Sequence, residues 1–284
     1  SNLCSLVFIV EGKKSRAMIT GDAFKINLAI ILESYRGRLA CDVLQLPHHG
    51  LCDTGHRGFY GAVGAHTLFI PISKAGHRCM RSDIYGDETE TVHKENGCLF
   101  NLDLSKVMWA KGNNNERLRI ARLVEDGEVV VDMFAGIGYF SIPIGVHSNA
   151  EKIYSIEINP NSHHFLCRNV ELNKINKKAG YDRLVPILGD CRIEAPKYSA
   201  DRVLMGYVKT THHFLSPAME CVKDGGIIHY HETVPDKLIE TRPYERVKEI
   251  AWECGEREVE VMNIQKIKRY APGVEHIVLD ARIY

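Results

Sequence analysis

The stretch Val129-Val130-Val131-Asp132-Met133-Phe134-Ala135-Gly136-Ile137-Gly138 decides the fold of this chain. Its β-branched start is typical of a strand buried in a parallel sheet. Gly136 and Gly138 permit a tight turn and a close approach of the backbone to a ligand. Residues 139–146 follow and can begin a helix. A strand, a glycine turn and a helix N-terminus in this order predict a nucleotide-type pocket at the carboxyl end of a sheet.

Two further strand-like stretches also end in an acid. Residues 152–159 place Glu157 about 20 residues after the glycine turn, where folds of this type carry a ribose-binding carboxylate. Residues 184–190 place Asp190 at the end of a third strand. Three successive strand-end acids suit an adenosine, which has two ribose hydroxyls and an exocyclic amine. The turn lacks the full Gly-x-Gly-x-x-Gly pattern of dinucleotide sites, so we predict an S-adenosylmethionine site in a class I methyltransferase-like domain.

The composition is that of an ordinary globular protein. The chain has 284 residues, of which 45% are hydrophobic and 25% are charged. Its 36 basic and 36 acidic residues give no net charge, so any basic surface for nucleic acid must be local. No apolar run approaches the ~20 residues that span a bilayer, so we expect no membrane partner. The nine cysteines are odd in number and form no Cys-x-x-Cys motif, which favours the cytoplasm over a disulfide framework.

The order of elements predicts the fold class. After residue 129, strands alternate with helices as far as residue 254, which indicates a mostly parallel α/β sheet of the Rossmann-like methyltransferase type. The last two strands, at residues 259–270 and 276–283, have no helix between them and predict an antiparallel end. We expect three parts: a small α+β segment over 1–84, a hairpin and helix that link it over 85–122, and a cofactor-binding catalytic domain over 123–284. The first residues lack an initiator Met and a signal-peptide pattern, so we expect a trimmed start.

Residues 1–84 differ in character from the rest of the chain. Thr20-Gly21-Asp22 and, at residues 42–50, Asp-Val-Leu-Gln-Leu-Pro-His-His-Gly resemble the C-terminal half of a metallo-β-lactamase-fold hydrolase. The resemblance implies that Asp22 and His48 or His49 are metal ligands. The His-x-His-x-Asp-His loop that carries most ligands in that fold is absent from the chain, so too few ligands remain for a two-metal site. We therefore expect a metal-free segment.

A second resemblance covers about residues 85–284. It rests on motifs that occur in this order: Lys94-Glu95-Asn96-Gly97, residues 108–113, Glu116-Arg117, the glycine turn, Met205-Gly206-Tyr207-Val208, His229-Tyr230-His231-Glu232 and Tyr270-Ala271-Pro272-Gly273. In these motifs the chain resembles the archaeal-type aminocarboxypropyltransferases of tRNA wybutosine synthesis, sisters of the tRNA (guanine-N1)-methyltransferases. The resemblance implies transfer of the 3-amino-3-carboxypropyl group of S-adenosylmethionine to C7 of 4-demethylwyosine in phenylalanine tRNA. It also implies cofactor contacts by Asp132, Phe134, Ala135, Gly136, Gly138, Glu157 and Asp190, without a metal.

The fourth strand distinguishes this reaction from methyl transfer. Base-methylating relatives have an Asn or Asp followed by Pro at its end, where the side chain holds the base. This chain has Gly206 and Tyr207 there, and we predict both as catalytic residues. Gly206 leaves room for a larger base or a rotated cofactor, and Tyr207 either stacks on the base or is a core-edge tyrosine. An N1-methyltransferase and a metal-dependent hydrolase stay open as alternative functions.

The candidate RNA contacts are basic residues late in the chain. Lys266, Lys268 and Arg269 form a local basic stretch that suits phosphate contacts, although a solvated edge strand has the same composition. Arg117 is predicted to bind substrate from a helix that begins at Asn115. The expected partner is the anticodon loop of phenylalanine tRNA, and the sequence predicts no oligomeric state.

Overall fold

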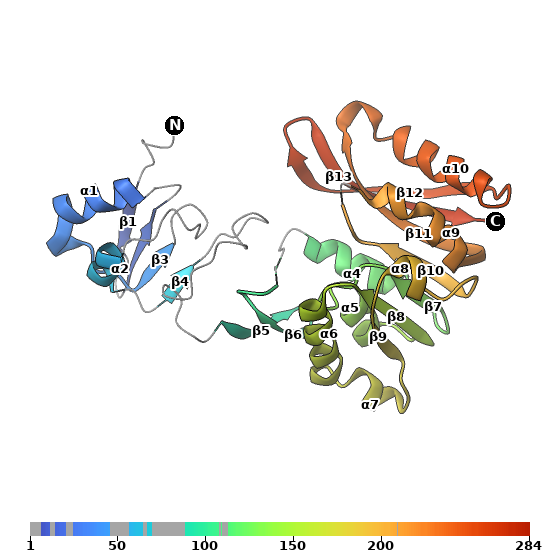
Figure 1. Ribbon diagram of the computed structural model, residues 1–284, viewed down its shortest axis with the longest axis horizontal. Helices are drawn as coiled ribbons and strands as arrows, with labels where there is room; N and C mark the ends of the chain where they lie inside the picture. Colours follow the sequence, from blue (N-terminus) through green and yellow to red (C-terminus); the bar gives the residue numbers. More distant parts are fainter. Residues whose placement is uncertain are drawn as a thin grey trace. The chain divides into compact units, whose positions relative to one another are not determined.

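The computed structural model describes residues 7–11, 15–20, 25–45, 57–64, 67–69, 89–107, 109, 113–208 and 210–284 (Figure 1). The chain divides into two compact units, one of residues 1–91 with 103–109 and the other of residues 92–102 with 110–284. The predicted boundaries, after residues 84 and 122, differ from these divisions. The three predicted parts of the chain stay a prediction. No helix in the described ranges is long and apolar enough to cross a membrane.

The first unit contains a four-stranded mixed sheet in the order β1-β2-β3-β4. Its elements are β1 (Phe8–Glu11), β2 (Arg16–Ile19), α1 (Lys25–Tyr35), η2 (Arg36–Arg38), β3 (Val43–Gln45), α2 (Arg57–Val63) and β4 (Thr67–Phe69). Met18, Leu28, Leu44 and Phe59 form its core. The arrangement is α+β, as predicted. The candidate metal ligands Asp22, His48 and His49 lie outside the described residues.

The second unit is built on a seven-stranded sheet in the order β12-β13-β11-β10-β7-β8-β9. The strands are β7 (Val129–Asp132), β8 (Lys152–Glu157), β9 (Leu184–Leu188), β10 (Ala200–Met205), β11 (Val222–Pro235), β12 (Val259–Ala271) and β13 (Val274–Ile283). Strands β7 to β11 are mutually parallel, while β13 pairs antiparallel with both β11 and β12. This confirms the prediction of a mostly parallel Rossmann-like sheet with an antiparallel end.

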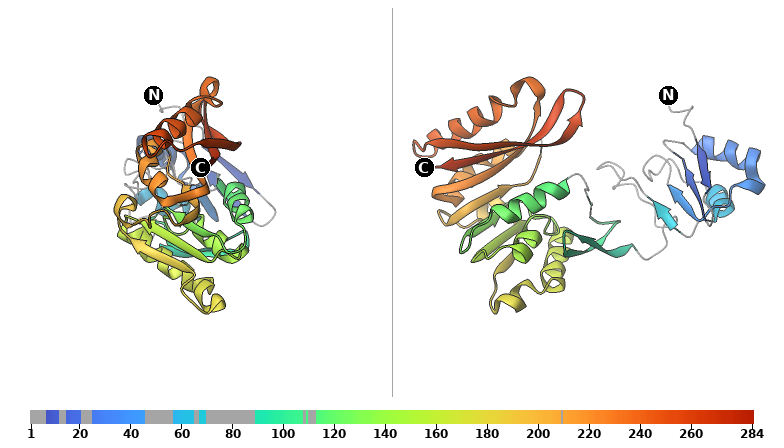
Figure 2. Two further views of the ribbon diagram at one scale, coloured as in Figure 1. Left: turned by 90° about the vertical axis from the view of Figure 1, so that its right-hand side faces the viewer. Right: turned by 180° about the vertical axis from the view of Figure 1, so that it is seen from behind.

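Helices cover both faces of this sheet. They are α4 (Asn114–Leu123), α5 (Ser141–His147), α6 (Pro160–Leu172), α7 (Ile175–Ala179), α8 (Cys191–Glu194), η7 (Thr211–Phe214), α9 (Leu215–Cys221), η8 (Asp236–Leu238) and α10 (Arg242–Glu253). Figure 2 shows α4 and α10 on opposite faces. Local sequence explains the start of α6, since the Asn159 side chain accepts a hydrogen bond from the Asn161 N–H and Pro160 is the first helical residue.

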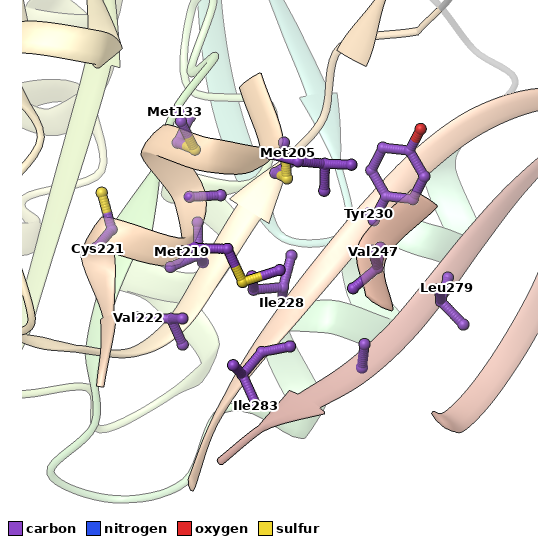
Figure 3. Packing of buried hydrophobic residues seen from close by; sticks show 14 of the residues in the cluster. Met133, Met205, Met219, Cys221, Val222, Ile228, Tyr230, Val247, Leu279 and Ile283 are labelled. Atoms are coloured by element: carbon purple, nitrogen blue, oxygen red, sulfur yellow. The ribbon is translucent and has the colours of Figure 1, made fainter. Parts of the chain in front are cut away.

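The main core lies between β10, β11 and β13 and the helices α9 and α10 (Figure 3). Met205, Met219, Tyr230, Val247 and Leu279 are buried there. Burying each such side chain stabilises the fold by about 1.5–3 kcal/mol. The packing therefore fixes the carboxyl end of β10, which leads directly into the Gly206-Tyr207 segment, and the part of β11 that contains the His229–Glu232 motif.

The hairpin of β5 (Glu90–Glu95) and β6 (Cys98–Asp103) is fastened to α6 by two asparagines one helical turn apart. Asn173 exchanges hydrogen bonds of 2.9 and 2.7 Å with the backbone of Leu99, and Asn169 exchanges bonds of 2.6 and 3.2 Å with that of Asn101. Each side-chain amide donates to and accepts from the strand backbone, as the backbone of a neighbouring strand would. Residues 92–102 thereby belong to the second unit, which contains the seven-stranded sheet.

Candidate cofactor and transfer site

The glycine turn between β7 and α5 has the conformation that its sequence predicts. Gly136 has φ +59° and Gly138 has φ +98°, both in the left-handed region that favours glycine. A Cβ on Gly136 would lie 2.6 Å from the Tyr139 ring, and one on Gly138 would lie 2.4 Å from Ile142. A side chain at either position would therefore require its neighbours to move.

Asp132 supports this turn from inside. Its carboxylate is 0% exposed, accepts a 2.7 Å hydrogen bond from the Ser141 hydroxyl and accepts a longer one, 3.3 Å, from the Phe134 N–H. Burial raises the pKa of Asp132 to about 6. Both oxygens are enclosed and accept hydrogen bonds within the turn, and the predicted contact of Asp132 with the cofactor stays a prediction.

Glu157 lies at the end of β8, where a ribose would be held. Its carboxylate accepts hydrogen bonds from the Gly136 N–H at 2.8 Å and from the Asn159 N–H at 2.7 Å. Each carboxylate oxygen can accept further bonds, so Glu157 can brace the turn and still receive ribose hydroxyls. The next residue, Ile158, is 67% exposed and supplies an apolar surface beside it. Ile158 was not among the predicted residues, although its place directly after a strand-end acid can be read from the sequence.

Asp190 lies at the end of β9, and its carboxylate already has hydrogen-bond partners. It caps α8 by accepting from the Arg192 N–H at 2.9 Å, and it also pairs with the Arg192 guanidinium. These bonds lower the pKa of Asp190. The Arg192 guanidinium lies 5.6 Å from the centre of the Phe214 ring. An adenine amine at Asp190 would therefore have to share this carboxylate with Arg192.

The fourth-strand segment brings two predicted residues together. Tyr207 stacks on Phe134, with ring centres 5.3 Å apart and planes inclined by 28°, and Phe134 also meets the edge of Phe214. Tyr207 is 43% exposed, which favours a ligand-facing ring over a core-edge tyrosine. A Cβ on Gly206 would lie 3.0 Å from the Phe140 ring, so this position is close to the limit for any side chain.

Arg117, the predicted substrate-binding residue, is buried. Its side chain is 2% exposed and pairs with Glu95 of the hairpin at 2.7 Å. Its guanidinium lies 4.9 Å from the centre of the Tyr139 ring. In the structure it joins α4, the hairpin and the residue after the glycine turn, and its contact with substrate stays a prediction. The helix also begins one residue before the predicted Asn115, at Asn114.

The basic stretch of β12 is only partly available to a ligand. Arg269 pairs with Glu275 at 2.9 Å and lies 3.6 Å from Asp236. The exposed amines of Lys266 and Lys268 have no ion pair within the residues that the structure describes. The two lysines are therefore the better phosphate candidates of the three.

A buried polar network, which was not predicted from the sequence, joins α4 to the sheet through hydrogen bonds. Asp280 of β13 accepts from Arg119 at 2.6 Å and contacts His229 Nδ1 at 2.5 Å. Arg119 also holds Glu116, and His229 Nε2 lies 2.7 Å from Arg202. Burial lowers the pKa of His229, and the bonds from His229 and Arg119 hold the pKa of Asp280 below its usual value despite its burial.

Two further groups lie at the carboxyl end of β11. His231 and His276 are buried with Nδ1 and Nε2 3.1 Å apart, and the His231 ring meets that of Phe140. On the other face of the strand, the buried Glu232 is held by Arg242 and Arg246, each at 2.7 Å.

Comparison with known proteins extends these observations. Residues 91–262 match the TRM5/TYW2 methyltransferase domain family. A tRNA(Phe) (4-demethylwyosine(37)-C(7)) aminocarboxypropyltransferase of Methanocaldococcus jannaschii is 51% identical over 199 residues, which are 70% of this chain and 77% of that protein. Its Pyrococcus horikoshii counterpart is 47% identical over 71% of this chain and 70% of that protein. A tRNA (guanine(37)-N(1))-methyltransferase of Pyrococcus abyssi is 41% identical, over 69% of this chain and 56% of that protein.

Solved structures give the same grouping. M. jannaschii TYW2 in complex with AdoMet has a TM-score of 0.66 and 51% identity over 70% of this chain and 88% of that one. P. horikoshii TYW2 in complex with MeSAdo has a TM-score of 0.69 and 38% identity over 94% of this chain and 88% of that one, so the match includes most of residues 1–84. These matches do not support the predicted resemblance of that segment to metallo-β-lactamase-fold hydrolases. The chain belongs to the TRM5/TYW2 family of tRNA-modifying enzymes with a class I methyltransferase fold.

Proposed function

We propose that this protein transfers the 3-amino-3-carboxypropyl group of S-adenosylmethionine to C7 of 4-demethylwyosine at position 37 of phenylalanine tRNA. The observation that carries the proposal is the Met205-Gly206-Tyr207 segment. It has no Asn or Asp side chain to hold a guanine ring nitrogen, and a Cβ on its glycine would lie 3.0 Å from the Phe140 ring, so the position leaves little room for such a side chain. The 51% identity to a relative that bears this activity in its name supports the same choice.

The cofactor residues are proposed from their position around the turn. The backbone from Phe134 to Gly138, including Ala135, faces S-adenosylmethionine. Glu157 accepts the ribose hydroxyls, and Asp190 accepts the adenine amine once Arg192 shares or releases it. No metal ion is needed for this reaction.

The reaction depends mainly on alignment of the base with the reacting carbon of S-adenosylmethionine. The sulfonium of S-adenosylmethionine supplies an activated carbon and a neutral leaving group, methylthioadenosine. C7 of the base forms a bond to the γ-carbon of the aminocarboxypropyl arm, the γ-carbon–sulfur bond breaks, and its electron pair stays on sulfur. The proton on C7 leaves to solvent. Phe134, Tyr207 and Gly206 contribute by holding the base in line with that carbon and by excluding water, and such alignment contributes about 7–11 kcal/mol in favourable intramolecular cases.

The RNA side of the site is proposed from charge and exposure. Lys266 and Lys268, with Arg269 in a lesser part, contact phosphates of the anticodon loop. We propose a cytoplasmic location, since tRNA occurs there and free thiols such as those of Cys98 and Cys221 stay reduced in that compartment.

The identity of the released nucleoside tests the proposal. Incubation with S-adenosylmethionine and tRNA that carries 4-demethylwyosine should release methylthioadenosine in step with the gain in mass of the tRNA. Accumulation of S-adenosylhomocysteine would instead identify a methyltransferase, the alternative that the 41% identical relative represents.

A further inference from the structure

A cleft of about 310 Å³ lies between the start of α4 and strand β12. It is lined by Asn114, Asn115, Glu116, Arg119, Gln265, Lys266 and Ile267. None of these residues belongs to the glycine turn, the strand-end acids or the Gly206-Tyr207 segment, so the cleft is separate from the cofactor site. Its volume is at the lower end of the roughly 300–1,000 Å³ of small-molecule sites.

A β-bulge shapes one wall of this cleft. Lys266 pairs with Ile277 and Lys268 with His276, so Ile267 is an extra residue in β12. In a regular strand successive side chains point to opposite faces, whereas a bulge redirects them. The bulge explains how three consecutive residues, Gln265 to Ile267, line the same cleft.

The opposite wall presents a fixed planar cation. The Arg119 guanidinium donates to Glu116 through Nε at 2.7 Å and Nη2 at 2.6 Å, and to Asp280 through Nη1 at 2.6 Å. These in-plane bonds hold its edges, and a fixed guanidinium plane is a good surface for stacking a nucleobase. Asn114 is likewise held, because its side-chain and backbone oxygens both accept from the Asn96 amide.

The remaining lining groups suit the edge and the phosphate of a nucleotide. The amides of Asn115 and Gln265 carry both donors and acceptors, which is what pairing with a base edge requires. The exposed Lys266 amine has no ion pair among the described residues, and a lysine in this state is a suitable phosphate contact. Sequence-specific recognition of RNA depends on such unstacked bases, held by a planar side chain and hydrogen bonds.

We infer that this cleft binds one unstacked nucleotide of the tRNA. Its base lies against Arg119 and the amides of Asn115 and Gln265, and its phosphate contacts Lys266. The inference rests on the proposed function, because it takes the RNA to be the substrate, and it adds a second base-reading site beyond the transfer site.

A thermodynamic cycle between the protein and the RNA tests the inference. Binding of the 284-residue chain would be measured by fluorescence anisotropy with anticodon stem-loop RNAs in which each loop nucleotide, in turn, is abasic. We expect one abasic position to weaken binding of the unmodified protein about fivefold or more, as for loss of one stacked base. Gln265→Ala with Asn115→Ala should weaken binding to the natural RNA by a similar factor but add little at that abasic position.

Lys268→Ala is the control, because Lys268 lies on the same strand as Gln265 but outside the cleft. It should weaken binding to every RNA by the same factor. The inference is overturned if no abasic position couples to the Gln265/Asn115 pair, or if Lys268→Ala shows the same coupling. Release of methylthioadenosine from the unmodified protein reports the proposed function separately, so its failure and that of the cleft are distinguishable.

Discussion

At the residue scale, Glu157 combines two tasks. It braces the turn through the Gly136 N–H and it faces the proposed ribose position. Glu157→Ala should weaken S-adenosylmethionine binding by about 1–3 kcal/mol, because ribose hydroxyls and the Gly136 N–H lose an acceptor. Isothermal titration calorimetry would measure this, with Glu151→Ala, an exposed acid on the approach to the same strand, as control. Unchanged affinity in Glu157→Ala would remove Glu157 from the cofactor site.

Gly206 is the second residue whose role is open to a direct test. An added Cβ would lie 3.0 Å from the Phe140 ring, so that ring or the base must shift by a few tenths of an ångström. Gly206→Ala should slow transfer by roughly tenfold or more while cofactor affinity stays nearly constant, since misplacement of about 1 Å costs up to 10²-fold. Single-turnover kinetics would separate the two. Gly37→Ala is the control, since a Cβ there meets nothing within 4 Å; an equal loss in both variants would contradict a role in alignment.

At the scale of elements, the turn and the sheet were predictable and the contacts across elements were not. The glycine turn and the strand-end acids are local patterns, and the structure places them where those patterns indicate. The burial of Arg117 was not predicted because its partner, Glu95, is 22 residues away in the hairpin, and the pattern of a helix does not show such a contact. Asp280 and Arg119 are 161 residues apart, and the bulge at Ile267 depends on pairing with β13, so neither had a local signal.

The strand β11 makes folding sensitive to acid through two buried histidines. Burial lowers the pKa of His229, and burial with the neighbouring His276 lowers that of His231 well below its ordinary value. The unfolded chain, with histidine pKa values near ~6.5, therefore binds more protons below that pH, so stability present above pH ~6.5 is lost on acidification. Asp132, with its pKa raised to about 6, opposes this loss, because the folded state binds its proton first as the pH falls from 6 towards 4.

We expect the free energy of unfolding in urea to fall between pH 7 and 5, by at most ~1.4 kcal/mol per pH unit for each histidine. His231→Gln should reduce this slope, because one of the two groups no longer titrates. His164→Gln, a histidine on the surface of α6, is the control and should leave the slope as it is. A slope that His231→Gln does not change would show that His231 is not the source of the acid sensitivity.

At the scale of the whole molecule, residues 1–84 pose the question of a second active site. The structural match to P. horikoshii TYW2 extends over most of them, and the chain lacks the loop that supplies most ligands to a dinuclear site. We predict that elemental analysis of the purified protein finds no two stoichiometric zinc or manganese ions. Two such ions, lost on Asp22→Ala, would show that the segment is a metal centre after all.

The absence of net charge sets how the whole molecule binds RNA. With 36 basic and 36 acidic residues, the chain has no general attraction for phosphate. The salt dependence of RNA binding therefore reports the number of local contacts between basic side chains and phosphates. Each phosphate contact on single-stranded RNA adds about 0.7 to the slope of log K against log salt concentration. Lys266→Ala with Lys268→Ala should therefore lower the slope by about 1.4, whereas Arg269→Ala should lower it less, because Glu275 already neutralises that guanidinium. Anisotropy titrations with the anticodon stem-loop between about 50 and about 200 mM salt would measure these slopes. An equal reduction of the slope for each of the three side chains would contradict the ranking that the Arg269–Glu275 pair implies.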